Sequence, residues 1–269
     1  MKKIFKNIHF SYIYKFILFI LLIFILISLS IKDHSQTFIE QAFKAPSKHH
    51  WFGTDYLGRD LFFRTILGLQ LSLFIALSSS FINFLIGIIW GTITAFSPPK
   101  IDIFLMKISD IIYSIPYILM VIILMIIFQN GGILSLIIAL SLTGWIPIAR
   151  MVRSEFLVLK NKNYVLFAKT LGGNPCYIVF KHLLPNSIEP ILSAVILSIP
   201  SIIYNEAFLS FLGLGIQPPK ATLGTLVKEG LPSMLYYPWV FLFPILTTGI
   251  LIFTFNYIGE KISKKIKKC

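Results

Sequence analysis

Side chains able to do chemistry are few in this sequence and stand apart from one another. The two cysteines, Cys176 and Cys269, do not form a C-x-x-C pair, so they indicate neither a metal site nor a redox centre. His49 and His50 are adjacent but have no cysteine or glutamate at ligand spacing, which favours loop residues in water over a metal site. The patterns H-E-x-x-H and G-x-S-x-G, which mark zinc peptidases and serine hydrolases, do not occur. We therefore expect no catalytic residues, no bound metal and no enzyme activity.

Nucleotide binding is also unsupported by the sequence. The phosphate-binding pattern G-x-x-x-x-G-K-[ST] does not occur, so the chain cannot hold ATP phosphates by that route. Gly213 and Gly215 imitate part of a dinucleotide-binding fingerprint, but the third glycine is missing and no strand–helix unit surrounds them. We expect no cofactor, and any energy from ATP must come from a partner protein.

The composition is that of an integral membrane protein. Of the 269 residues, 56% are hydrophobic and only 13% are charged, about half the share of roughly 25% in soluble domains. The mean hydropathy is +0.82. The net charge of +13 would indicate nucleic acid in some soluble proteins, but beside long apolar segments it is better explained by membrane orientation. We expect membrane lipid, and no nucleic acid, as a partner.

Apolar segments predict an all-α fold with about six transmembrane helices. Their approximate bounds are 16–31, 67–96, 111–128, 133–149, 189–208 and 237–259. The first segment follows a basic N-terminus, which leaves a cleaved signal peptide as the alternative to a first membrane helix. Between the second and third segments, Asp102, Lys107 and Asp110 predict a short return to water.

The distribution of positive charge predicts the orientation. With both termini in the cytoplasm, 17 of the 24 lysines and arginines lie on the cytoplasmic side, in agreement with the positive-inside rule. The same orientation places the basic stretch 150–186 and both cysteines in the cytoplasm, where a disulfide is not expected.

The basic stretch 150–186 has the pattern of two short helices joined by a corner. One apolar face is predicted on the first helix, made by Tyr164, Phe167, Ala168 and Leu171. A second face continues on the next helix, in Ile178, Val179, His182 and Leu183. A sharp corner that carries aromatic side chains favours insertion into a groove on another protein over a flat position on lipid.

Residues that end or begin helices define the corner within this stretch. Gly172-Gly173 can end the first helix in a left-handed conformation. Asn174 is a suitable N-cap for the second helix, and Pro175 suits its first position. Pro185 is expected to end the second helix before the fifth span begins.

The segment before the second span carries paired charges. Gly53-Thr54-Asp55 predicts a turn and the start of a short helix at the membrane surface. On such a helix Asp55 would pair with Arg59, and Asp60 with Arg64, because each pair stands four residues apart.

The basic stretch resembles the EAA loop of bacterial ABC-importer permeases. The pattern of that loop is E-A-A, three residues, Gly, nine residues, then I-x-L-P, and the positions that match it are Ala168, Gly172, Leu184 and Pro185. Three positions depart from it, where the pattern has Glu, Ala and Ile: Leu166, Phe167 and His182. A salt bridge made by that glutamate in relatives is therefore not expected in this chain.

Two further motifs resemble the dipeptide, oligopeptide and nickel branch of the same family. The first, GTDxLGRD, is carried by Gly53, Thr54, Asp55, Gly58, Arg59 and Asp60. The second, EAxLSFLGLGxQPP, begins at Glu206 and includes Gly213, Gly215, Pro218 and Pro219. With the EAA loop, they make the chain similar to the C-type permease of a two-permease importer.

The resemblance implies a multi-pass transport subunit of an ATP-driven importer in the bacterial cytoplasmic membrane. The implied partners are a second permease subunit in a heterodimer, two ATP-binding subunits and an extracytoplasmic substrate-binding protein. Residues 1–66 would form an N-terminal membrane helix plus an extracytoplasmic segment, and 67–269 the permease domain with its coupling loop 150–186. The residues implied in ATPase coupling are Tyr164, Phe167, Ala168, Leu171, Gly172, Gly173, His182, Leu184 and Pro185.

The substrate stays open at this level. The resemblance favours peptides, with nickel or a nickel chelate as the alternative substrate of the same kind of importer. The alternative class of protein is an ion-coupled secondary transporter, which commonly carries ionisable groups in mid-membrane. Here Glu189 and Glu206 are expected at the two ends of the fifth span, which disfavours ion coupling.

Overall fold

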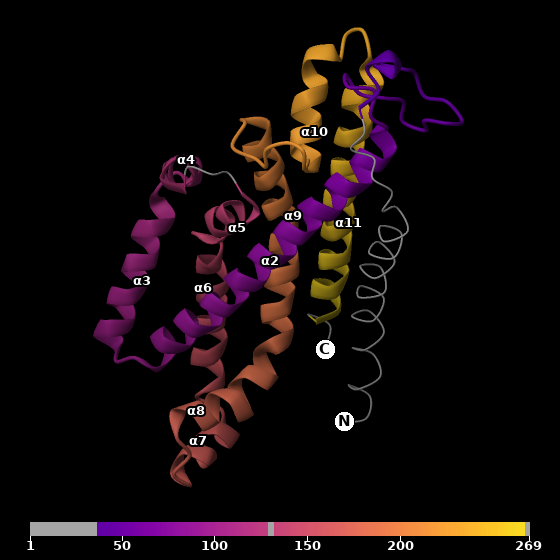
Figure 1. Ribbon diagram of the computed structural model, residues 1–269. Helices are drawn as coiled ribbons and strands as arrows, with labels where there is room; N and C mark the ends of the chain where they lie inside the picture. Colours follow the sequence, from indigo (N-terminus) through magenta and orange to yellow (C-terminus); the bar gives the residue numbers. More distant parts are fainter. Residues whose placement is uncertain (1–36, 129–131, 267–269) are drawn as a thin grey trace. The chain divides into compact units, whose positions relative to one another are not determined.

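The computed structural model describes residues 37–128 and 132–266. The predicted first span and Cys269 lie outside the described residues. Within them the chain is helical, and its only β-pairing is one isolated bridge between Thr54 and Asp60 (Figure 1). Three helices are long and apolar enough to cross a membrane, and five spans result if each of two bent helix pairs counts as one. The all-α membrane architecture is therefore confirmed.

Two compact units make up the fold. Among the described residues, unit 1 contains 37–75, 132–133 and Ile203–Ile258, so it includes a short 3-10 turn, Ile39–Gln41, and the first part of α2, Leu61–Phe96. It also holds the end of α9, Leu184–Phe211, and most of α11, Pro238–Ile266. Between α9 and α11 lie α10, Leu223–Gly230, and a 3-10 turn, Leu231–Ser233.

Among the described residues, unit 2 contains 76–128, Leu134–Ile202 and 259–266. After the remainder of α2 come α3, Pro99–Ser114, and α4, Tyr117–Phe128. The next four helices are α5, Ile133–Ser141, α6, Trp145–Leu159, α7, Asn163–Thr170, and α8, Pro175–Ile178. A π-helical turn, Val179–Leu183, then leads into α9.

The third span differs from its prediction. The chain is already helical from Pro99, before the predicted start at residue 111, and Asp102 is buried on α3 whereas Lys107 and Asp110 are exposed. The chain then turns by 82° between α3 and α4. The cause is Pro116, which has no N–H and holds Ile115 in an extended conformation with ψ 131°.

The fourth and fifth spans run further than predicted. Helix α6 passes the predicted end at residue 149 and continues to Leu159, after a bend of 43° near Gly144. The prediction that Pro185 ends a helix is wrong, because α8, the π-helical turn and α9 form one helix, Pro175–Phe211. Leu184 N–H bonds to Val179 O, and this shifted register carries the helix past Pro185, which has no N–H.

A close helix crossing organises the core of unit 2. Gly87 and Gly91 on α2 form a G-x-x-x-G pattern, and a Cβ on Gly91 would lie 2.6 Å from Ala149 O of α6. This contact allows α6 to approach α2 closely. Beside it a buried cluster joins α2, α6, α7, α8 and α9, and its members are Ala95, Ile148, Val152, Phe156, Val165, Ile178, Val179, Leu183 and Ile191.

Candidate functional site

The α7–α8 corner, residues 163–183, has the geometry that its glycines predict. Gly172 has φ +83°, and its N–H bonds to Lys169 O at 3.1 Å. Gly173 N–H bonds to Ala168 O at 3.0 Å. The two bonds together form a Schellman C-cap, which satisfies carbonyls that the end of α7 would leave free.

The second helix of the corner begins as predicted. Asn174 accepts a hydrogen bond at 2.7 Å from the Tyr177 N–H through its side-chain oxygen, and Pro175 occupies the first helical position. His182 lies in the π-helical turn between two tyrosine rings, with ring centroids 6.2 Å from Tyr164 and 5.5 Å from Tyr177. Leu184 and Pro185 of the loop motif stand in the first turn of α9.

The corner has a buried inner side and an exposed outer side. Val165 and Ile178 are 3% and 5% exposed in the core of unit 2. The apolar face predicted on α7 points outward, since Phe167 is 66% and Leu171 is 72% exposed, and Tyr164 is also exposed. The outer side of the corner therefore carries a group of exposed apolar side chains that are not part of the core of unit 2.

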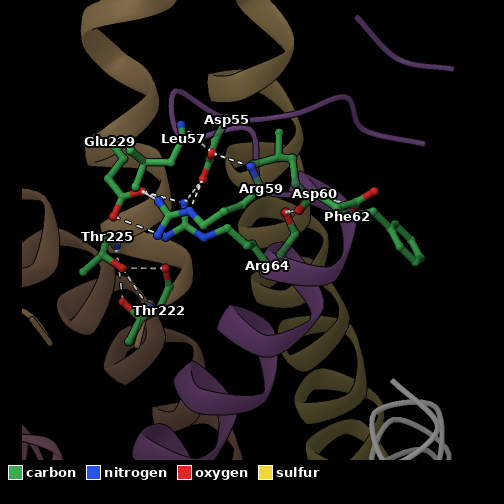
Figure 2. A network of polar contacts seen from close by, with 11 residues as sticks. Asp55, Leu57, Arg59, Asp60, Phe62, Arg64, Thr222, Thr225 and Glu229 are labelled. Atoms are coloured by element: carbon green, nitrogen blue, oxygen red, sulfur yellow. Dashed lines mark hydrogen bonds and ion pairs between the residues drawn. The ribbon is translucent and has the colours of Figure 1, made fainter. Parts of the chain in front are cut away.

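A second cluster, of buried charges, lies in unit 1 and is drawn in Figure 2. Asp55 Oδ2 accepts hydrogen bonds from Arg59 Nε at 2.7 Å and from Arg64 Nη1 at 2.6 Å. Arg64 Nη1 also donates to Glu229 Oε2 on α10 at 2.7 Å. The Asp55 side chain is 2% exposed, so its charge depends on these arginines. The cluster therefore ties the GTDxLGRD motif to α10.

The motif is a folded loop, and the predicted surface helix from Asp55 is wrong. Helix α2 begins only at Leu61, because Gly58 has φ +73° and turns the chain beforehand. A Cβ on Gly58 would lie 1.9 Å from Phe38 O, so only glycine fits. The predicted pair Asp55–Arg59 is confirmed, although it forms across this loop at 2.7 Å.

The other predicted ion pair is wrong, because the Asp60 side chain binds other groups, and Asp60 meets Arg64 only through a backbone hydrogen bond. Its Oδ1 accepts the N–H groups of Phe62 and Phe63 at 2.9 and 3.2 Å, which makes Asp60 the N-cap of α2. Its Oδ2 lies 2.8 Å from His50 Nδ1, so His50 is held by an acid and is not a free loop residue. Among the residues that the structure describes, no group of three or more His, Cys, Asp or Glu could hold a metal ion.

Glu229 is the member of this cluster that sequence reasoning missed. It stands 165 positions after Arg64, and nothing local in the sequence connects the two. The only available signal was the pattern T-x-x-T at Thr222 and Thr225, where the two side chains and backbones form a capping box that starts α10.

The EAxLSFLGLG motif surrounds a buried carboxyl. Glu206 is fully buried on α9, five residues before the end of the helix. Its oxygens accept hydrogen bonds of 2.8 Å from Ser72 of α2 and from Ser210. Ser72 in turn accepts the Leu223 N–H at 3.2 Å, so Glu206 holds the first turn of α10 in place.

The glycines of this motif end α9. Gly213 has φ +90°, its N–H bonds to Ser210 O, and the next N–H bonds to Leu209 O, which is a second Schellman cap. A Cβ on Gly215 would lie 2.4 Å from Ser210 Oγ, which explains the second glycine. Pro218 and Pro219 lie in an exposed loop before α10.

Comparison with known proteins decides the family. A family model described as "Binding-protein-dependent transport system inner membrane component" matches residues 83–268, which include α3 to α11. The chain belongs to this family. The α7–α8 corner and the glycine-capped end of α9 are thus features of a membrane permease.

Relatives of this permease carry the names of transport subunits. It is 46% identical over 228 residues to the "Oligopeptide transport system permease protein OppC" of Bacillus subtilis (strain 168), covering 85% of this chain and 74% of that protein. It is 41% identical to the "Dipeptide transport system permease protein DppC" of the same organism, covering 91% and 77%. It is 34% identical to the "Glutathione transport system permease protein GsiD" of Pectobacterium atrosepticum, covering 81% and 72%.

Solved structures share its fold. The MetNI methionine ABC transporter, in an inward-facing conformation, matches with a TM-score of 0.63 at 20% identity, covering 77% of this chain and 97% of that chain. A structure described as "an amino acid ABC transporter with histidines" matches with a TM-score of 0.57 at 15% identity, covering 75% and 94%. At these identities the comparison supports the fold of the permease and not its substrate.

Proposed function

We propose that this permease is the membrane subunit of an ATP-driven importer that carries peptides across the bacterial cytoplasmic membrane. The observation that carries the proposal is the α7–α8 corner, whose inner side is buried in unit 2 and whose outer side exposes Phe167 and Leu171. The 46% identity with an oligopeptide permease supports peptides as the substrate class. The chain itself performs transport and no catalysis.

The corner is the docking element for an ATP-binding subunit. Its outer side combines exposed aromatic and aliphatic groups with exposed Lys169, a composition that suits a groove on a soluble protein. The residues that make the contact or shape it are Tyr164, Phe167, Ala168, Leu171, Gly172, Gly173, His182, Leu184 and Pro185. Gly172 acts through the backbone, since its positive φ sets the angle between the two helices.

The assembled importer contains this chain, a second permease subunit, two ATP-binding subunits and an extracytoplasmic binding protein. Both termini and the corner lie in the cytoplasm, and a helix within residues 1–66 precedes the permease domain, 67–269, as the first of six spans. The positive charge of the termini and of the basic stretch supports this orientation. The motif residues 53–60 and 213–219 face the extracytoplasmic side.

Glu206 is the residue that bears on the alternative of an ion-coupled transporter. Glu206 is a buried carboxyl on a spanning helix, which is the kind of group that ion-coupled transporters use. Both of its oxygens, however, bind serine hydroxyls that anchor α10, so its contacts are those of an architectural group.

The decisive experiment is uptake by proteoliposomes that contain the complete importer, with ATP enclosed and binding protein and a labelled oligopeptide outside. Uptake is expected to require enclosed ATP and to persist when ionophores collapse the ion gradients. Uptake driven by an ion gradient without ATP would refute the importer class. ATP-dependent uptake of nickel chelate with no peptide uptake would leave the class intact and overturn the substrate.

A further inference from the structure

Charges of the basic stretch that appear free in the sequence are bound within unit 2. On α6, Arg153 donates two hydrogen bonds of 2.6 Å to Asp102 of α3, from Nε to Oδ1 and from Nη2 to Oδ2. Lys160 Nζ donates to Ala95 O at 2.8 Å, at the C-terminal end of α2, where a cation is favourable. These side chains join α6 to α2 and α3, so they are not available to lipid or to another protein.

Two ion pairs connect α6 with α3, and they differ in environment. Arg150 Nη2 donates to Asp110 at 2.6 Å, but these side chains are 41% and 58% exposed. In the other pair, the Arg153 and Asp102 side chains are 29% and 11% exposed, and both oxygens of the carboxylate are used. Exposed pairs contribute little, whereas parallel, partly buried arginine–carboxylate pairs fix geometry. The Asp102–Arg153 pair is therefore the stronger link.

Neighbouring side chains on the same turns of α6 contact the corner. Val152 and Phe156 flank Arg153 along α6, are completely buried, and belong to the cluster that includes Val165 of α7 and Ile178 of α8. Helix α6 consequently contacts both the α7–α8 corner and α3. A displacement of the corner can therefore reach α3 through α6.

Two bends mark where this group of helices ends. The chain turns by 43° between α5 and α6 and by 82° between α3 and α4. Between the bends, α6 is held to α2 by the close contact at Gly87 and Gly91, and to α3 by the ion pairs. The end of α2, α3, α6 and the corner thus form one packed group inside unit 2, with breaks in the helical hydrogen-bonding at its borders.

We propose that Asp102 and Arg153 are positioning residues that make α3 move with the corner when the ATP-binding subunits displace it. The proposal rests on the proposed function, because it assumes that those subunits bind the corner. Neither side chain needs to touch the substrate. The two parallel hydrogen bonds between these side chains keep the orientation of α3 relative to α6. The movement of these helices relative to α4 and α5 is then taken up at the bends at Pro116 and Gly144.

The test measures peptide uptake and ATP hydrolysis on the same proteoliposomes. Asp102→Asn and Arg153→Gln are each expected to lower the number of peptides taken up per ATP by about tenfold, while hydrolysis continues. The reversed pair, Asp102→Arg with Arg153→Asp, is expected to regain most of this ratio, because it restores the attraction. Asp110→Asn is the matched control and should leave the ratio unchanged, since its pair is exposed.

Labelling of Cys176 separates this proposal from the proposed function. Cys176 is exposed in the corner, and a chain with Cys269→Ser carries it as the sole cysteine. If the ATP-binding subunits do not protect Cys176 from maleimide in the chain with the native pair, the docking itself is refuted. If Cys176 is protected and both single variants keep the native ratio, the role of Asp102 and Arg153 is refuted.

If the single variants Asp102→Asn and Arg153→Gln do not assemble into the importer, the variant with the reversed pair tests the proposal. Assembly with coupled uptake supports the proposal, because only the attraction between the two positions has been kept. Assembly without coupled uptake overturns it. A reversed chain that remains unassembled also counts against it, since a pair that only orients α3 tolerates reversal.

Discussion

At the residue scale, buried charge is the feature with the largest consequences. Arg64 lies between Asp55 and Glu229, and the side chains of Arg64 and Asp55 are 8% and 2% exposed. Removing one partner of a buried pair costs much more than the pair contributes, because the remaining charge stays out of water. The GTDxLGRD loop is therefore held by charge balance as much as by its glycine turns.

The two acids of this cluster are expected to differ in effect. Asp55→Asn leaves two arginines facing one partly exposed glutamate and should destabilise the protein by about 3 kcal/mol. Glu229→Gln keeps Arg64 paired with Asp55 and should cost about 1 kcal/mol. The midpoint of thermal unfolding in detergent measures both, with exposed Lys220→Gln as the control. Equal midpoints for the two acid variants would contradict the charge-balance argument.

The corner glycine allows a test of backbone conformation alone. Gly172 has φ +83°, and a Cβ there would meet no heavy atom within 4 Å. Gly172→Val is disfavoured by about 1–2 kcal/mol through its left-handed backbone, whereas Asn tolerates that region. The valine variant should insert normally and lose transport, while Gly172→Asn should retain most of it. Normal transport by the valine variant would refute the docking role of the corner.

At the element scale, the helices of unit 2 are organised by close approach. Gly87 and Gly91 let α2 pack against α6, and the ion pair of Arg153 adds α3 to the same group. The capped corner then follows from α6 without an intervening flexible segment, because α7 begins four residues after α6 ends. This continuity is what makes transmission of motion through α6 physically reasonable.

A glycine substitution tests the α2–α6 contact. Gly91→Leu places side-chain atoms where Ala149 O and Val152 already lie, at 2.6 and 2.7 Å from the new Cβ. Overpacking of this kind costs about 1–3 kcal/mol. Gly249→Leu on α11 is the matched control, because it is also on a spanning helix and a Cβ there meets nothing within 4 Å. Thermal unfolding should show a lower midpoint for the first variant only, and equal midpoints would contradict the contact.

At the scale of the whole molecule, orientation is the property that remains to be measured. The described residues supply three to five spans, and the segment before them is expected to add one. We predict that fluorescent-protein fusions at either terminus fluoresce and that alkaline phosphatase fusions at the same points are inactive, because both ends lie in the cytoplasm. An active phosphatase at one end only would show an odd number of spans and contradict the six-span topology.

What the sequence determined by itself is local. Apolar segments predicted membrane helices because lipid requires each segment to satisfy its own backbone hydrogen bonds. Gly172, Gly173 and Asn174 predicted the corner correctly because caps depend on residues within one turn. The family motifs could be recognised for the same reason, since they are short and contiguous.

Only the tertiary structure decided which distant groups meet. Arg64 pairs with Glu229 across 165 positions, and Arg153 with Asp102 across 51, so no local spacing predicts either contact. The sequence instead favoured neighbours such as Asp60 and Arg64, because pairing four residues apart assumes a helix that the turn at Gly58 prevents. Long-range pairing depends on which helices pack together, and that follows from the small residues and bends that bring α2, α6 and α10 to their neighbours.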